Sequence, residues 1–503
     1  MCCQTGKAGS GLKNITLIMK KVSRPVDFFI RSDVFLMAAV LLLVRLILLN
    51  WSDETDADGV SRVFTSWNWA KDPFWFKTSI WAPFHYYLIG TGFLIWKELI
   101  LVPKIIHLAF SVLLLFPFYY FTRREFNRPG AVFATVLLAF SPLILRLGFL
   151  SLAEIPALFF VILAMNLLSK ANQTEKLHWY LLAGVSMTVA AGFRYESWLL
   201  ILLFSFMVFL RRRFSGGMLF LATSLIFPVT WMIQSQLYTG DPLFSFHANS
   251  DFIRNVLGIN AKVDFEATLR RVWFFPFSFL IAVGPVVVWF FLKRLVTTIK
   301  NLRNLKFPDL WIIPLIIFLM VMIYNAVAGK LLLHHRFTAT LVVLALPWIA
   351  LDFDSFERKT FMKVLFSLGL TILLSIVYTI GGTSPLPRLK NQPVKQLTPF
   401  LQETAQKDSK LIIDFIGWED TWYIGLHSGF DPEDILMLGN ENEATASSAR
   451  FTEFADCQCR RVFVVRDQSV MMSYILDNQR NNIQPVEEFQ SDHLRVFIAD
   501  GKD

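Results

Sequence analysis

The chain has 503 residues, of which 54% are hydrophobic and 17% are charged, and its mean hydropathy is +0.49. A water-soluble protein of this length would need more surface charge, so the composition excludes that class and indicates a membrane protein. The net charge of +9 is uneven, because residues 384–503 hold 12 Lys+Arg and 19 Asp+Glu, a net of −7, and residues 1–383 hold a net of +16. We interpret this imbalance as membrane topology, and we expect no nucleic-acid partner.

Apolar runs suited to crossing about 30 Å of hydrocarbon recur along the chain. After an N-terminal segment over residues 1–32, they predict a polytopic α-helical membrane domain over 33–383. The eleven predicted spans are 33–51, 99–121, 131–150, 152–169, 179–193, 197–210, 216–237, 273–292, 309–327, 337–352 and 364–381.

The distribution of Lys and Arg predicts the orientation, since cytoplasmic loops carry an excess of both. The N-terminal segment has six of them, and alternate loops near residues 123–128, 211–213 and 293–306 are also basic. We therefore expect a multi-pass protein of the cytoplasmic membrane. Its N-terminus would be cytoplasmic, and eleven spans would place the C-terminus outside.

The first outer loop, 52–98, begins with four carboxylates in SDETDADG, directly after the first span. It also holds five Trp, typical of an aromatic belt at headgroup depth. Stretches 58–70 and 84–96 can form amphipathic helices in the interface. A solvated loop would explain the acids, but acids at the edge of a span favour a functional site.

Further ionisable residues stand at outer ends of the predicted spans. Any of them could form a local salt bridge, but cations that grip phosphate and a carboxylate that takes a proton suit an anionic lipid headgroup. These residues are Arg146 and Glu154, Arg194 and Glu196, and His334, His335 and Arg336.

The C-terminal part, 384–503, alternates strand-like and helix-like stretches and predicts a small exported α/β domain. The expected helix is 469–482, and the expected strands are 410–415, 434–438, 460–465 and 494–499. Cys457 and Cys459 are one residue apart, a spacing that rarely forms a disulfide. No ligand spacing typical of a metal site accompanies them.

Over residues 30–350 the sequence resembles the GT-C superfamily of membrane glycosyltransferases, especially the protein O-mannosyltransferases and the bacterial aminoarabinose transferases of lipid A. The order and spacing of several motifs carry this resemblance. They are DETDADG, WAPFHYYLIG, YYFTRREFNRPGAVFATVLLAFSPL, SLAEIPALFF, AGFRYESWLL, YTGDPLFS and RFTATLVVLALP.

The resemblance implies a GT-C-like fold and transfer of a sugar from a polyprenyl-phosphate donor to a hydroxyl acceptor on a lipid, glycan or protein. The reaction would occur at the outer face and invert the sugar. Inversion needs one carboxylate as general base. The leaving group is a phosphate, which needs cations rather than a general acid.

By this resemblance Asp56 or Asp58 is the preferred base, while Asp53-Glu54 matches the adjacent acids of the O-mannosyltransferases and stays open. Glu154, His85 and Glu196 are candidates for the acceptor or sugar, and Glu196 is also expected to pair with Arg194. The candidates for the lipid phosphate are Arg194, Arg336, His335 and Arg146.

No metal motif is firm, although Asp56 and Asp58 could hold a divalent ion. Two alternatives remain open: a transporter or flippase of lipid-linked sugars, and an oligosaccharide ligase. Transporters tend to show broken spans and internal repeats, and no repeat is visible in this sequence.

Overall fold

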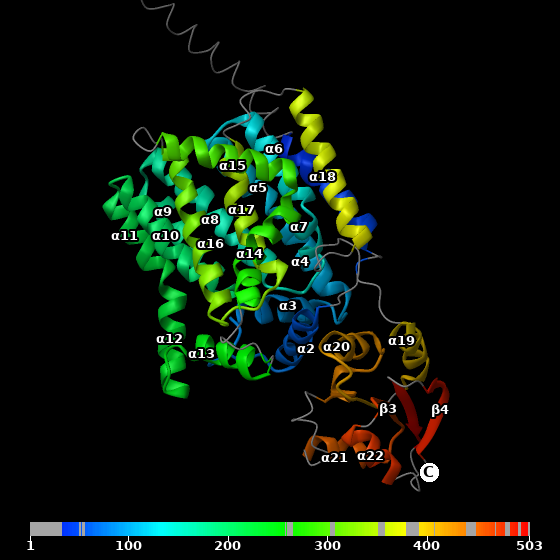
Figure 1. Cartoon of the computed structure of the whole chain (residues 1–503). Helices are drawn as coiled ribbons and strands as arrows, with labels where there is room; N and C mark the ends of the chain where they lie inside the picture. The colour runs from blue at the N-terminus through cyan, green and yellow to red at the C-terminus, as the bar shows by residue number, and fades with distance from the viewer. Residues whose placement is uncertain are drawn as a thin grey trace, which may run out of the picture.

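The computed structural model describes residues 33–49, 52, 56–256, 258, 265–301, 307–350, 358–378, 392–406, 408–438, 449–467, 469–477, 483–490 and 494–500. A helical bundle forms the larger part, and a sheet with its own helices lies at one end of it (Figure 1). Asp53, Glu54 and the predicted boundary at residue 384 lie outside the described residues.

Four helices of the described residues are long and apolar enough to cross a membrane. Two of them combine successive helices that meet at a single residue, Leu114 or Leu225. The four are Leu101–Glu125 (α4, Leu101–Leu113, and α5, Leu115–Glu125), Glu154–Thr174 (α8), Phe214–Thr239 (α11, Phe214–Ser224, and α12, Ile226–Thr239) and Pro308–Val327 (η4, Phe307–Trp311, and α16, Ile312–Val327).

The other predicted spans also fall on helices, most of them short. Because helices of 10–17 residues are brief for a span, the predicted count of eleven is not confirmed. The remaining helices are 33–48, α6 (Arg128–Phe140), α7 (Pro142–Leu147), α9 (Leu177–Phe193), α10 (Glu196–Leu210), α17 (Ala339–Ile349, preceded by η5, His335–Thr338) and α18 (Arg358–Tyr378).

The predicted single span 273–292 is wrong. The structure has two helices there, α14 (Phe265–Val283) and α15 (Pro285–Lys300), bent by 118° at Gly284. Gly284 has a φ of 84°, which side-chain-bearing residues rarely adopt. Pro285 lacks the N–H that would continue the helix, so the two residues together force the break. Even counted as one bent span, the pair raises the number of candidate spans only to five.

The loop 52–98 contains the two predicted helices, α2 (Ala57–Lys71) and α3 (Phe84–Ile95). The face of α2 that includes Val60, Val63 and Phe64 is buried. On α3 the exposed face is itself largely apolar, with Leu94 and Ile95 exposed, so the amphipathic pattern predicted for 84–96 is weak. Two more elements follow α12: α13 (Phe244–Asp251) and the π-helix η2 (Phe252–Val256).

The C-terminal region forms a five-stranded mixed sheet in the order β2-β1-β3-β5-β4. β1 (Lys410–Ile413) pairs in parallel with β2 (Ile435–Met437) and β3 (Arg461–Val465), and β5 (Arg495–Ala499) is antiparallel to β3 and β4 (Ile483–Gln490). The predicted strands are confirmed, and β4 was missed. The accompanying helices are α19 (Gln392–Thr404), α20 (Trp418–His427), η8 (Pro432–Asp434), α21 (Ala449–Ala455) and α22 (Val470–Asp477).

The sheet region packs against the loop 52–98, with α20 beside α2 (Figure 1). Val60, Val63 and Phe64 share one buried apolar cluster with Ile424 of α20. The rings of Phe64 and Trp422 are 6.0 Å apart. Since α2 also carries the acidic motif at its start, this shared core fixes the helix that presents the candidate site.

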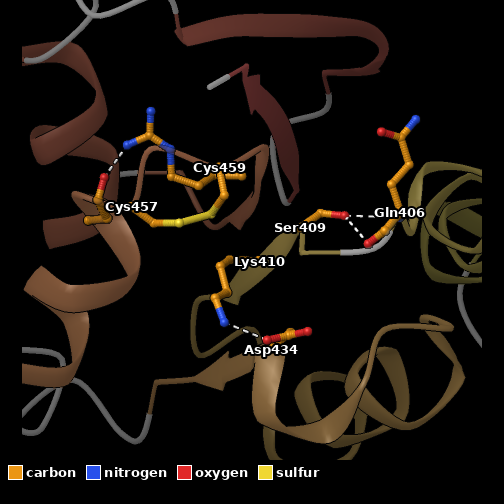
Figure 2. The surroundings of a disulfide bond; sticks show 8 residues. Gln406, Ser409, Lys410, Asp434, Cys457 and Cys459 are labelled. Atoms are coloured by element: carbon orange, nitrogen blue, oxygen red, sulfur yellow. Dashed lines mark hydrogen bonds and ion pairs between the residues drawn. A yellow bond between two sulfur atoms is a disulfide. The ribbon is translucent and has the colours of Figure 1, made fainter. Parts of the chain in front are cut away.

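Cys457 and Cys459 form a disulfide (Figure 2), contrary to the prediction from their spacing. The bend between α21 and β3 brings their Cα atoms to 5.2 Å, within the range that a disulfide spans. Arg461, at the start of β3, donates to the carbonyl of Ala455. The bridge therefore closes the link between a helix and a central strand.

Gly130 provides a test of helix packing. It lies buried in the first turn of α6, where an added Cβ would overlap the carbonyl oxygen and Cβ of Ala350. Because backbone must move to admit it, Gly130→Ala should destabilise the protein by about 1–3 kcal/mol. The thermal unfolding midpoint in detergent checks this. Gly369→Ala, at an exposed helix position with open space, is the control, and equal midpoints for the two variants would contradict this packing.

Candidate active site

Arg336 gathers three carboxylates around one guanidinium. Its Nη1 donates to both oxygens of Asp56, at 2.9 and 3.0 Å, and its Nη2 donates to Asp58. Its Nε lies 3.5 Å from Oε1 of Glu154. The acids come from the starts of α2 and α8, and the arginine comes from η5, roughly 280 residues later than the first two. The structure thus joins the acidic motif, Glu154 and Arg336, all singled out in the sequence.

Arg194 extends this cluster. Its Nη1 donates to Oε1 of Glu154 at 2.6 Å, and its Nε and Nη2 donate to the two oxygens of Glu196 at 3.1 and 2.5 Å. The predicted Arg194–Glu196 pair is confirmed. Glu154 contacts both Arg194 and Arg336. The ion pairs of these two arginines therefore form one network.

Helix ends place these charges. Asp56 caps α2, accepting the backbone N–H groups of Asp58 and Gly59 at 3.0 and 3.4 Å. Glu154 and Glu196 are the first residues of α8 and α10, where the helix dipole favours negative charge, and Arg194 caps the carboxyl end of α9, where it favours positive charge. The helix ends therefore determine the positions of these acids locally, in addition to their long-range ion pairs.

The network is largely shielded from solvent. Glu154 is 4% exposed and Arg336 is 6% exposed, whereas the Asp58 side chain is 36% exposed. Burial alone would raise the pKa of Asp58, but the positive charges of Arg336 and Arg62 outweigh it and lower that pKa. Burial and the charge of Arg336 lower the pKa of His334 to about 4, although Asp56 opposes them. At neutral pH Asp58 is therefore ionised and His334 is neutral.

A cavity of about 40 Å³ opens beside the network. Its polar end is lined by Glu154, Arg194, Glu196 and Arg336. The rest of its wall is mostly apolar, with side chains from α8, α10, α16 and the segment before η5 that include Leu158, Val161, Leu200, Phe318, Met322 and Leu331. A charged end joined to an apolar wall suits an amphipathic ligand.

Three predicted candidates have described hydrogen bonds to groups other than the network's acids and arginines. His85 is fully buried, with its Nε2 3.0 Å from Nε2 of His107. His335 Nδ1 lies 2.8 Å from the hydroxyl of Ser278, and its ring faces Phe274. Arg146 is buried on α7 and donates to the hydroxyl of Ser52 at 3.2 Å.

Two residues near the network were given no specific role by the resemblance, although His334 was among the ionisable residues singled out in the sequence. His334, rather than His335, approaches the acids, with its Nε2 3.9 Å from Oδ2 of Asp56. Arg62 lies on α2, one turn after Asp58, and is 5% exposed. The spacing of four residues from Asp58 on a predicted helix could have revealed it.

The oxygens of Asp56 and Asp58 that a divalent ion would use face the guanidinium of Arg336. In the part of the chain that the structure describes, no group of three or more His, Cys, Asp or Glu could hold a metal ion. A divalent ion held by Asp56 and Asp58 would have to displace these contacts with Arg336, and the possible metal site stays a prediction.

Part of this chain is similar to a known protein family. Residues 77–233 match the family described as dolichyl-phosphate-mannose-protein mannosyltransferase. No curated protein matches the chain.

Solved structures resemble almost the whole chain at low sequence identity. ArnT from Cupriavidus metallidurans in the apo state has a TM-score of 0.64 and 12% identity, covering 93% of this chain and 98% of ArnT. The same protein bound to undecaprenyl phosphate gives 0.62 and 13%, covering 92% and 97%. The Archaeoglobus fulgidus oligosaccharyltransferase with Zn and sulfate gives 0.52 and 17%, covering 86% and 68%. The family match and this shared fold confirm the resemblance predicted from the motifs.

Replacing Arg336 tests the network. Arg336→Gln leaves three acids without their shared cation and should destabilise the protein by about 3–5 kcal/mol. In the wild type the lowered pKa of Asp58 adds stability at neutral pH that is lost as the pH falls through that pKa. In the variant the pKa of Asp58 should rise, so protonation should relieve the repulsion.

The difference in thermal midpoint between the wild type and Arg336→Gln should therefore shrink as the pH falls from neutral to below about 4, where Asp58 of the wild type begins to take up its proton. Arg270→Gln, at an exposed position of α14, serves as the control. A difference that stays constant with pH would contradict the network.

Proposed function

We propose that this chain, a membrane glycosyltransferase of the GT-C type, moves a sugar from a polyprenyl-phosphate carrier to a hydroxyl acceptor. The reaction would take place at the outer face of the membrane, with the N-terminus in the cytoplasm and the sheet region outside. We retain the other predicted spans as part of this proposal, since each of them falls on helical residues, and the bent pair α14 and α15 replaces the predicted span 273–292. The distribution of Lys and Arg supports the orientation.

The observation that carries the proposal is the meeting of Asp56, Asp58 and Glu154 with Arg336 and Arg194 beside a partly apolar cavity. In this proposal the polyprenyl chain follows the apolar wall, and the phosphate lies at the polar end. ArnT has been solved with undecaprenyl phosphate, and the archaeal oligosaccharyltransferase with a dolichol-phosphate, which supports a lipid phosphate as the ligand.

Asp58 is our preferred general base. Its side chain is 36% exposed, compared with 15% for Asp56, and Asp56 is also engaged as the cap of α2. An exposed carboxylate with a lowered pKa is ionised at neutral pH and able to accept the proton of an acceptor hydroxyl. Asp56 would then hold Arg336 in place. Asp53 and Glu54 remain alternatives.

The transfer would proceed with inversion. Asp58 takes the hydroxyl proton while the acceptor oxygen forms a bond to the anomeric carbon, and the bond from that carbon to the phosphate oxygen breaks. The electron pair leaves with the phosphate, which gains a negative charge that cations must stabilise. Arg194 and Arg336 line the polar end of the cavity and are candidates for this role. Glu154, between them, would orient the sugar or the acceptor.

His85, His335 and Arg146 fit this scheme less well, because each is engaged with groups outside the network. We propose structural roles for them. The hydroxyl acceptor is a lipid, a glycan or a protein in this proposal, and the transfer assay with candidate acceptors identifies which.

Transfer assays on purified membranes test the function. A panel of radiolabelled polyprenyl-phosphate sugars is supplied with candidate acceptors to the wild type and to Asp58→Asn, Asp56→Asn and Asp53→Asn. Loss of the general base should lower the transfer rate by about 10²- to 10⁴-fold, and we expect this in Asp58→Asn. Asp251→Asn, at an exposed position of α13, should keep the wild-type rate.

Full activity in all three variants would remove the acidic motif from the chemistry. A wild type that transfers no sugar from the whole panel would contradict the proposed reaction and favour the transporter alternative.

A further inference from the structure

Arg62 is a buried cation that has no matching anion among the described residues. It is 5% exposed, and its Nε and Nη1 atoms have no hydrogen-bond partner. Asp58, one turn earlier on α2, is close enough for its pKa to respond to the charge of Arg62. Even so, the described residues place no carboxylate within ion-pair distance of Arg62. Keeping a guanidinium buried in this way is costly, so the position calls for an anion that arrives from outside.

Two aromatic rings hold this guanidinium. The central carbon of Arg62 lies 5.1 Å from the ring centre of Trp81 and 5.9 Å from that of Tyr86. Contacts of this kind partly compensate for the lost solvation of the cation. The Nε and Nη1 groups of Arg62 still have no hydrogen-bond partner, and guanidinium N–H groups of this kind can donate to phosphate oxygens.

The other two arginines of the site are already compensated. Arg336 and Arg194 face four carboxylates, those of Asp56, Asp58, Glu154 and Glu196. Two positive charges against four negative ones leave this part of the described site with an excess of two negative charges. The four acids weaken the attraction of Arg336 and Arg194 for an incoming phosphate, so a third cation that no described acid pairs with would strengthen it.

We propose that Arg62 binds the phosphate of the lipid-linked sugar donor. The proposal rests on the function proposed above and adds a binding residue that was not among the candidates from the sequence. Arg62 lies one helical turn from the preferred base on the same face of α2, since residues four apart are neighbours on a helix. One helix therefore presents both the group that takes the acceptor proton and the group that receives the leaving phosphate. The charge that the phosphate gains during transfer would be stabilised by Arg62.

Lipid binding to the purified full-length protein tests the proposal. Undecaprenyl phosphate and undecaprenol are the two probes, because they differ only in the phosphate. The ratio of their affinities measures the phosphate contact separately from the binding of the apolar chain. The ratio is measured for the wild type, Arg62→Gln, Arg62→Lys and the exposed-site control Arg270→Gln.

Arg62→Gln should lower the preference for the phosphate about 10- to 100-fold, since a hydrogen-bonded charge is lost. Its affinity for undecaprenol should stay unchanged, which also shows that the variant is folded. Arg62→Lys, which keeps the charge but loses the fork, should fall in between. Arg270→Gln should match the wild type.

An unchanged preference in Arg62→Gln would overturn the proposal and leave the proposed function standing. A wild type with no preference for the phosphate would contradict both. If Arg62→Gln binds neither lipid, the Arg62→Lys variant decides between the outcomes. A several-fold loss of its preference for undecaprenyl phosphate over undecaprenol supports the contact between Arg62 and the phosphate. An unchanged preference overturns the proposal.

Discussion

The ion pairs of Arg336 are the interaction on which the site depends. One guanidinium from η5 contacts acids from the starts of α2 and α8, so it connects the loop 52–98 with two parts of the helical bundle. Without this cation, Asp56, Asp58 and Glu154 would bring like charges together in a poorly solvated place. Their proximity is stable only because the arginine is present. The apolar cluster between α2 and α20 then secures the same helix from its other side.

The charges of the site are distributed unevenly, and this has a functional consequence. Arg336 and Arg194 are surrounded by acids, whereas Arg62 lies over the rings of Trp81 and Tyr86, and no carboxylate of the described residues forms an ion pair with it. A site built only for stability would pair every buried charge. A cation left without a partner is better explained by a ligand that brings its own negative charge. The two halves of the network would then act on opposite ends of the reaction, the acids on the hydroxyl and Arg62 on the phosphate.

Much of the architecture could be predicted because apolar runs and alternating patterns determine helices and strands locally. The predicted spans fall on helices, and four predicted strands are present. Strand β4 was missed because its sequence, IQPVEEFQ, contains a proline and two acids, and it relies on pairing with β5 at the edge of the sheet. The break at Gly284 is visible in the sequence as a Gly-Pro pair within an apolar run. The length of that run predicts one span, whereas the Gly-Pro pair predicts the break that the structure shows.

The site was predictable in its residue types and only partly in its partners. Acids and arginines at the ends of spans marked the region, but the contact between Arg336 and Asp56 joins residues far apart in the sequence. Local patterns cannot specify such a pairing. The neighbouring histidines show the same limit, because a difference of one position places His334 beside Asp56 and His335 against Ser278.

A double-mutant cycle between Arg336 and Asp56 would test the central claim most directly. The unfolding free energy in detergent is measured for the wild type, Arg336→Gln, Asp56→Asn and the double variant. We expect a coupling energy of about 1–3 kcal/mol, because each single change removes the ion pair between Arg336 and Asp56 and leaves the other member of the pair in place. A coupling energy near zero would contradict the claim that this ion pair organises the site.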